Sequence, residues 1–179
     1  MKNFLLGVFS TLLLLCLAAF AYLRLGFADV RADVPPSRLE SALLGPAVRA
    51  YVRRHAPEIP NPFPPTDQNL VAGGKIYFSE CSGCHGDLEP GKGGSAAALI
   101  PAPPQFSSVG SDFTEAQIFW VAKHGIRRSG MFVNGLWDSD ERLWQVSAFI
   151  KRIRSLPPSV RTTLLTPAPA PAPASAPAK

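Results

Sequence analysis

The 179 residues, with a formal net charge of +5, leave room for one modest globular domain and raise the question of a nucleic-acid partner. The charge distribution disfavours that partner, because residues 66–156 contain nine Lys or Arg and nine Asp or Glu, and the basic excess lies in the flanks. A domain this small also buries little apolar surface, so a metal or a covalent cofactor is a plausible structural support.

An uncharged apolar run from Phe4 to Leu23 opens the chain. Its twenty residues match the hydrocarbon core of a bilayer, which is about 30 Å thick. A secretory signal usually has a shorter apolar run before a small-x-small cleavage site, and Ala19-Phe20-Ala21 supplies such a site. The length favours a transmembrane anchor over residues 1–24, with a signal peptide as the alternative. Cys16 inside this run is interpreted as an apolar side chain and not as a ligand.

Residues 25–65 are predicted to form a helical, proline-rich spacer. Ser37 to His55 has the apolar periodicity of a helix, which Gly45-Pro46 is expected to kink or split. The prolines of PEIPNPFPPT, which follow this helix, predict a stiff, extended connection.

Residues 66–156 have the pattern of a helical domain. One helix is expected to begin near Thr66, another at Thr114 and a last one after Asp138 or Ser139. No segment has a confident strand pattern, so the predicted fold class is all-α.

Two features refine this outline. Gly73 and Gly74 lie inside the first helix, where each costs about 1 kcal/mol relative to Ala, so another backbone or a bulky ring is expected to pack against them. Residues 157–179, which end in a Pro-Ala run from Thr166, are predicted to be a disordered tail.

The motif CSGCHG, from Cys81 to Gly86, carries the chemistry of the domain. A dithiol site of the thioredoxin type needs a parallel sheet around it, which the helical pattern does not offer. A zinc site needs four ligands, and His55 and His124 would have to join the two cysteines from distant, irregularly spaced positions.

C-x-x-C-H is the attachment pattern of a c-type haem. Cys81 and Cys84 lie on one side of a helical turn, where both can form thioethers, and His85 then supplies the proximal iron ligand. Met131 is the favoured distal ligand because the other methionine is the initiator. His124 is the alternative, which would give a bis-histidine haem.

Four segments in order resemble a class I monohaem cytochrome c of the bacterial membrane-anchored kind. They are GGKIYFSECSGCHG, IPAPPQF, HGIRRSGM and SDERLWQVSAFIKRI. The resemblance implies a small cytochrome c fold of three to four helices around one haem. It also implies that Gly73 and Tyr77 pack against Val146 and Phe149, and that a carbonyl at Pro101 or Pro103 holds the proximal histidine.

The function expected from this combination is electron transfer by one covalent haem c with His/Met ligation, in a bacterial respiratory or related redox chain. The chain is expected to be an electron carrier and not an enzyme, with a redox donor and acceptor as partners. The haem domain should lie on the periplasmic side of the inner membrane. A haem subunit of a larger oxidoreductase complex is the alternative, and a haem gas sensor is a further one.

Overall fold

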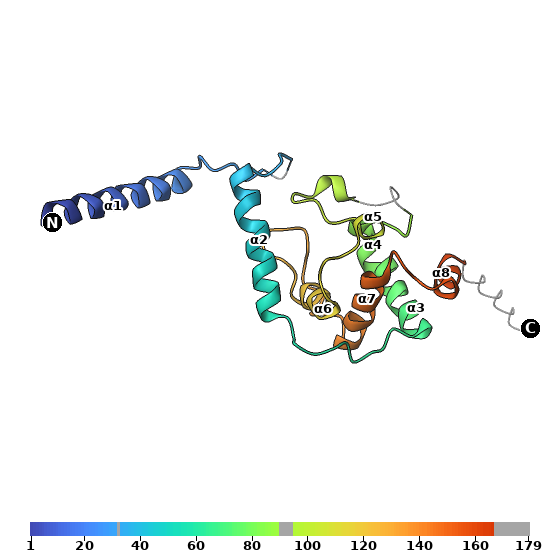
Figure 1. Ribbon diagram of the computed structural model, residues 1–179. Coiled ribbons are helices and arrows are strands. Elements are labelled where there is room, and N and C mark those ends of the chain that lie inside the picture. Colours follow the sequence, from blue (N-terminus) through green and yellow to red (C-terminus); the bar gives the residue numbers. More distant parts are fainter. Residues whose placement is uncertain (32, 90–94, 167–179) are drawn as a thin grey trace, which may run out of the picture. The chain divides into compact units, whose positions relative to one another are not determined.

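The computed structural model describes residues 1–31, 33–89 and 95–166, which form helices and loops with no strand among them (Figure 1). The all-α fold class predicted from the sequence is confirmed. The chain divides into two compact units, Met1–Val34 and the residues from Pro35 onward, which are described separately.

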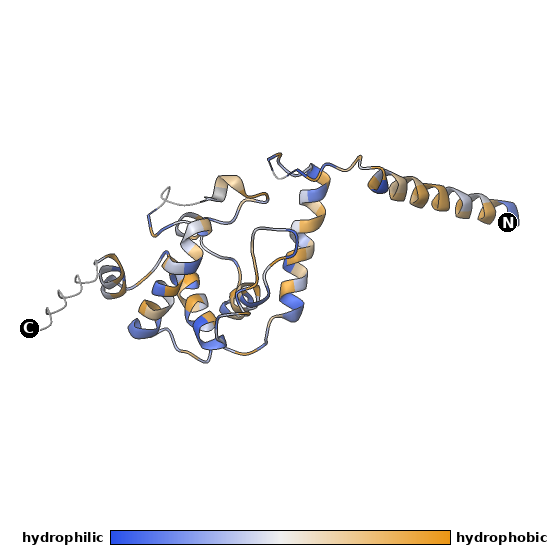
Figure 2. Cartoon of the chain, turned by 180° about the vertical axis from the view of Figure 1, so that it is seen from behind, coloured by the Kyte–Doolittle hydropathy of each residue, from blue (hydrophilic) through white to orange (hydrophobic). Residues whose placement is uncertain are grey.

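The first unit consists of helix α1, Lys2–Arg24, and a short loop. Figure 2 shows hydrophobic residues along most of this helix, and none of its side chains is buried. Its 23 residues give a length of about 35 Å, enough to cross a bilayer. It is the one helix among the described residues that is long and apolar enough to do so. The helix fits a single-pass membrane anchor, although signal sequences share these properties.

The core of the second unit is built from α3, Asp67–Ile76, α6, Glu115–His124, and α7, Asp140–Arg152. Both α3 and α6 pack against α7. Each of the three helices begins at a hydroxyl side chain, Thr66, Thr114 or Ser139, that accepts a hydrogen bond from the backbone N–H three residues later. The three helix starts predicted from the sequence are therefore confirmed.

Gly73 and Gly74 allow α3 to cross α7 in direct contact. A Cβ at Gly73 would lie 2.2 Å from the backbone oxygen of Gln145, so no larger residue fits there. Tyr77 packs on Phe149 with ring centroids 5.3 Å apart, and Val146 belongs to the same buried cluster. The close approach expected at the two glycines is confirmed.

Helix α8, Pro158–Leu165, corrects the prediction that the chain is disordered from residue 157. Val160 is fully buried. The Leu164 side chain packs so closely on Gly74 of α3 that a Cβ at Gly74 would lie 2.5 Å from its Cδ1 atom. Pro158 occupies the first turn of the helix, where its missing N–H costs nothing. The remainder of the predicted tail, residues 167–179, lies outside the described residues.

Helix α2, Arg38–His55, confirms the helix predicted from Ser37, and Pro46 does not split it. Its C-terminal half packs on α6: Val52 is 1% exposed, and the rings of Tyr51 and Trp120 lie 5.7 Å apart. The part of the predicted spacer from Pro35 onward therefore belongs to the same compact unit as the helical domain.

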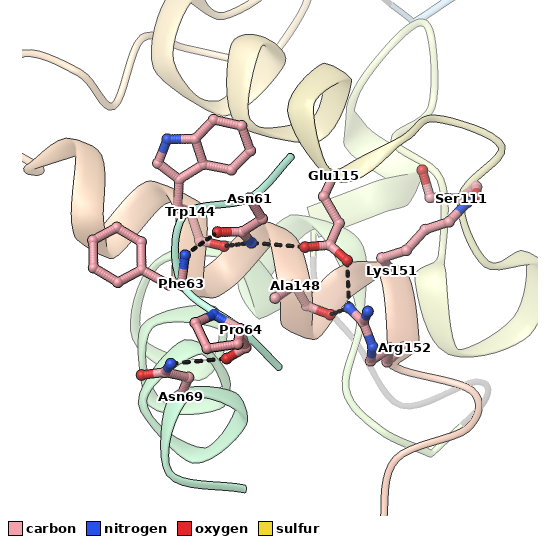
Figure 3. Close-up of polar contacts among 10 residues, drawn as sticks. All are labelled: Asn61, Phe63, Pro64, Asn69, Ser111, Glu115, Trp144, Ala148, Lys151 and Arg152. Carbon is pink, nitrogen blue, oxygen red and sulfur yellow. Dashed lines mark hydrogen bonds and ion pairs between the residues drawn. The ribbon is translucent and has the colours of Figure 1, made fainter. Parts of the chain in front are cut away.

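The proline-rich segment after α2 is held against the core and does not project away from it. The Asn61 amide donates to Glu115 of α6 at 2.7 Å and to the Trp144 carbonyl of α7 at 3.0 Å (Figure 3). Glu115 also accepts a hydrogen bond from Arg152. A part-buried amide with both partners supplied by the core fixes the path of the chain.

Candidate functional site

The cysteine motif ends a continuous helical segment. Helix α3 passes into a π-helical turn, Tyr77–Cys81, and then into the short helix α4, Ser82–His85. Single π turns inside helices are found often at functional sites. Gly86, with φ +81, ends α4 in a conformation that favours glycine. Cys81, Cys84 and His85 are thereby brought together over little more than one turn.

Tyr77 fixes the end of this segment from within the core. Its hydroxyl donates to the carbonyl oxygen of Gly86 at 2.7 Å, with the His85 carbonyl at 3.2 Å. Burial raises the pKa of Tyr77 well above its usual value, so the hydroxyl remains a donor. The sequence predicted Tyr77 as a packing residue and missed this hydrogen bond to the motif.

Both cysteine thiols are free and partly buried. Burial, with a smaller contribution from the negative charges of Glu80 and Asp138, raises the pKa of Cys81 to about 12. Dithiol redox sites depend on a lowered pKa, so this environment argues against a redox-active pair. Within the described ranges, no three His, Cys, Asp or Glu side chains are grouped as a metal site would require.

The His85 ring is held in one orientation. Its Nδ1 lies 2.9 Å from the carbonyl oxygen of Pro104, and a carbonyl only accepts, so Nδ1 carries the proton and Nε2 keeps its lone pair. The Phe106 ring stacks on the imidazole, with centroids 4.6 Å apart and planes 14° apart. Burial lowers the pKa of His85, which favours the neutral, metal-binding form.

The resemblance predicted that a carbonyl at Pro101 or Pro103 holds His85. This prediction is wrong, because the carbonyl that lies next to His85 Nδ1 belongs to Pro104. The side chain of Gln105 explains how the loop is positioned. Its amide donates to the Cys84 carbonyl at 3.0 Å and to the Pro103 carbonyl at 3.2 Å. Gln105 thus joins the proline loop to the motif. It is the one polar residue in IPAPPQF, and this is the only sequence signal that could have indicated its role.

Met131 lies in a loop after α6 that is tightly closed on itself. Its carbonyl accepts from Ile126 N–H at 2.9 Å, and its N–H donates to the Ser129 hydroxyl at 3.1 Å. A Cβ on Gly125, which has φ +66, would lie 2.7 Å from the Met131 oxygen, so the loop requires glycine there.

The two candidate distal ligands differ in exposure. The Met131 side chain is half-buried and packs against a cluster that includes Phe119, Leu143 and Trp144. His124 ends α6 and is exposed, with its ring 4.8 Å from that of Trp120. The cysteine motif instead adjoins the other cluster, around Tyr77 and Phe149, which Cys81 contacts.

The family model for "Cytochrome C oxidase, cbb3-type, subunit III" matches residues 68–150. The matched range contains the whole C-x-x-C-H motif and Met131. These residues form a monohaem c-type cytochrome domain. The cytochrome domain implies one covalently bound haem c, and the chain contains a single C-x-x-C-H. Neither the curated proteins nor the solved structures gave a significant match.

The free thiols and the oriented imidazole of the cytochrome domain fit this cofactor chemically. Attachment requires two unpaired sulfurs, which Cys81 and Cys84 provide. Axial ligation requires a neutral imidazole with one free nitrogen, which the Pro104 contact leaves at Nε2. α2 and α8 lie outside the matched range but belong to the same compact unit.

A charged cluster lies beside the attachment motif of the cytochrome domain. Arg142 donates to Asp138 at 2.6 Å and to Glu80 at 2.5 Å. The Asp138 side chain is 4% exposed, and its Oδ2 atom is buried without a hydrogen-bond partner. Partial burial, together with Asp138, raises the pKa of Glu80, while Arg142 opposes the shift. One arginine therefore bridges two carboxylates near Cys81, and the cluster keeps a net negative charge when both are ionised.

Proposed function

We propose that Cys81 and Cys84 attach the haem through thioethers and that His85 and Met131 supply the two axial ligands. The bound haem supplies a one-electron iron couple. The observation that carries this proposal is the Pro104–His85 hydrogen bond, which presents a neutral imidazole next to two free thiols. With both axial positions filled, no site remains on the iron for a substrate, which suits electron transfer by a carrier.

The residues around the motif have a positioning role. The Pro104 carbonyl accepts the proton of His85 Nδ1, and the stacked Phe106 ring restricts rotation of the imidazole. Gln105, which lies between Pro104 and Phe106 in the chain, donates a hydrogen bond to the Cys84 carbonyl and so links this loop to the motif. Tyr77 fixes the end of the motif by its hydrogen bond to the Gly86 carbonyl. A ligand held from several sides changes its geometry little when the charge at the iron changes.

The visible spectrum of the purified full chain tests this function. We expect a reduced-minus-oxidised spectrum typical of a c-type haem and no binding of carbon monoxide to the reduced protein, because Met131 fills the sixth position. Carbon monoxide binding would indicate an open or labile site and favour the gas sensor.

A second candidate function is that of a haem subunit in a larger membrane oxidoreductase, which the name of the matching family model favours. The donor and acceptor would then be fixed neighbours in a complex. Purification from native membranes in mild detergent separates the two candidates: a subunit retains partner proteins at constant stoichiometry, and a mobile carrier is recovered alone.

The proposed location is the periplasmic face of a bacterial inner membrane, with α1 as the anchor, because c-type haem is attached on that side. Trypsin added to spheroplasts is expected to cut at the exposed Arg24 or Arg31 and to release a soluble haem-bearing fragment. Intact right-side-out cells of the same strain serve as the control. A haem domain that stays protected until the inner membrane is lysed would place it on the cytoplasmic side.

The Glu80 cluster predicts a pH-dependent reduction potential. Carboxylate charge near the haem stabilises ferric iron, so protonation of Glu80 should raise the potential. Since the pKa of Glu80 is raised, this rise should begin above the usual Glu value of about 4.3 as the pH falls. Glu80→Gln should give a higher potential and remove the pH dependence in this range. Arg142→Gln should lower the potential, and we expect both changes to be on the order of tens of millivolts.

Redox titrations of these variants at several pH values measure the effect. Glu141→Gln is the matched control, because Glu141 is an exposed carboxylate one residue before Arg142 on α7. A potential that varies with pH equally in the wild type and in Glu80→Gln would show that another group titrates.

A further inference from the structure

Helix α2 has apolar residues on two faces, and α6 covers only one of them. Val52 is 1% exposed, and Gly45 and Val48 are half-buried on the same side. Leu39 and Leu43 are 69% and 60% exposed, although they are among the largest apolar side chains of the helix. Figure 2 shows hydrophobic and hydrophilic residues alternating along α2.

Several of the exposed small and large apolar residues form a stripe, whereas Leu44, which is 57% exposed, lies outside it, about 100° from Leu43. At about 100° per residue, Leu39, Leu43, Ala47 and Ala50 fall within about 80° of one another around the helix axis. Val52 lies about 140° or more from each of them, on the side packed against α6. The stripe is therefore distinct from the face around Val52, and it comes nearest to the α6 contact at Ala47, about 40° from Tyr51.

Basic residues lie beside and within this stripe. Arg53 lies about 40° from Leu39, and Arg54 lies within the stripe between Leu43 and Ala47, both of them exposed. Arg38 and Arg49 lie nearer the Val52 face. A helix with an apolar face and arginines at its border is typical of helices that lie in the interface of an anionic membrane, where long basic side chains reach the lipid headgroups.

The chain keeps α2 close to a bilayer. Residues 25–37 link the end of α1 to the start of α2, and thirteen residues span about 45 Å when fully extended. A membrane is thus present at high effective concentration around α2, whereas any other partner has to be recruited.

We infer that α2 lies on an anionic lipid surface, with Leu39 and Leu43 inserted among the lipids and Arg53 and Arg54 at the headgroups. This inference rests on the proposed anchoring by α1. It goes beyond anchoring because α2 also packs on α6, so a membrane-bound α2 would hold the cytochrome domain at a fixed height and orientation above the bilayer.

Spin-label accessibility in the full haem-containing chain tests the inference. The label is attached to Leu43→Cys or to Ser41→Cys, each in a Cys16→Ser background, and the reduced protein is placed in vesicles of phosphatidylcholine and phosphatidylglycerol. Ser41 is the matched control, because it is exposed and lies about 160° from Leu43 on the same helix. An unchanged haem spectrum verifies that each variant is folded.

Oxygen is concentrated in lipid and a nickel chelate in water, so collision rates with both identify the environment of each label. We expect the ratio of oxygen to nickel collisions to be several-fold higher at Leu43 than at Ser41. Equal, water-like ratios would overturn the inference. Low collision rates with both reagents at Leu43 would also overturn it, because they would show that a protein partner or a second copy covers the stripe.

Extraction of the same vesicles with alkaline carbonate separates this inference from the proposed anchoring. Protein that resists extraction and has a water-like Leu43 label would contradict the inference alone. Release of the protein by carbonate would contradict the anchor and the inference together.

Discussion

Replacing both Cys81 and Cys84 with alanine is expected to abolish haem retention and to leave a chain that does not fold. The thioethers are the proposed covalent links, and the clusters around Tyr77 and Phe119 are small for a unit of this size. Without the haem, the domain loses apolar mass from its core as well as its cofactor. In a denaturing gel stained for haem, the wild type should retain the signal and the double variant should show none.

Two further variants make this result specific. Cys16→Ala removes the cysteine of α1 and should leave haem content unchanged. Cys84→Ala alone should retain one thioether and hence part of the haem, with a changed absorption maximum. Haem that survives acid-acetone extraction from the Cys81→Ala, Cys84→Ala variant would show that the attachment site lies elsewhere.

The sequence predicted those features that depend on local chemistry. Thr66, Thr114 and Ser139 each satisfy free N–H groups at a helix start, and this preference is strong enough to locate the helices. Gly73 stood out because glycine within a helix is costly without a neighbour that needs the space. The spacing of Cys81, Cys84 and His85 on one turn follows from the motif itself.

The sequence could not predict features that depend on long-range register. IPAPPQF contains three prolines, and which carbonyl reaches His85 depends on how Gln105 anchors the loop to Cys84. Helix α8 begins at the second of two prolines and packs only two apolar side chains, Val160 and Leu164, so its apolar pattern is too short to predict a helix. The docking of Asn61 depends on Glu115, 54 residues away, which no local pattern records.

Truncation of Met131 to alanine is expected to remove the distal ligand and lower the reduction potential. A thioether ligand raises the potential of a c-type haem, and axial ligation sets potentials over about 0.8 V, so we expect a decrease on the order of 100 mV or more. The weak charge-transfer band of ferric His/Met haem, near the red end of the visible spectrum, should disappear. Because Met131 is half-buried, the free energy of unfolding should also fall by about 1–2 kcal/mol.

Met131→Leu separates ligation from packing, because leucine conserves the apolar volume without the sulfur. Like Met131→Ala, this variant should lack the charge-transfer band and have a lowered reduction potential. Its free energy of unfolding, however, should stay close to that of the wild type. His124→Ala should change neither property, since His124 is exposed at the end of α6. If His124→Ala opens the iron to carbon monoxide while both Met131 variants keep the wild-type potential, then histidine is the distal ligand, and the tightly closed Ile126–Met131 loop serves only to end α6.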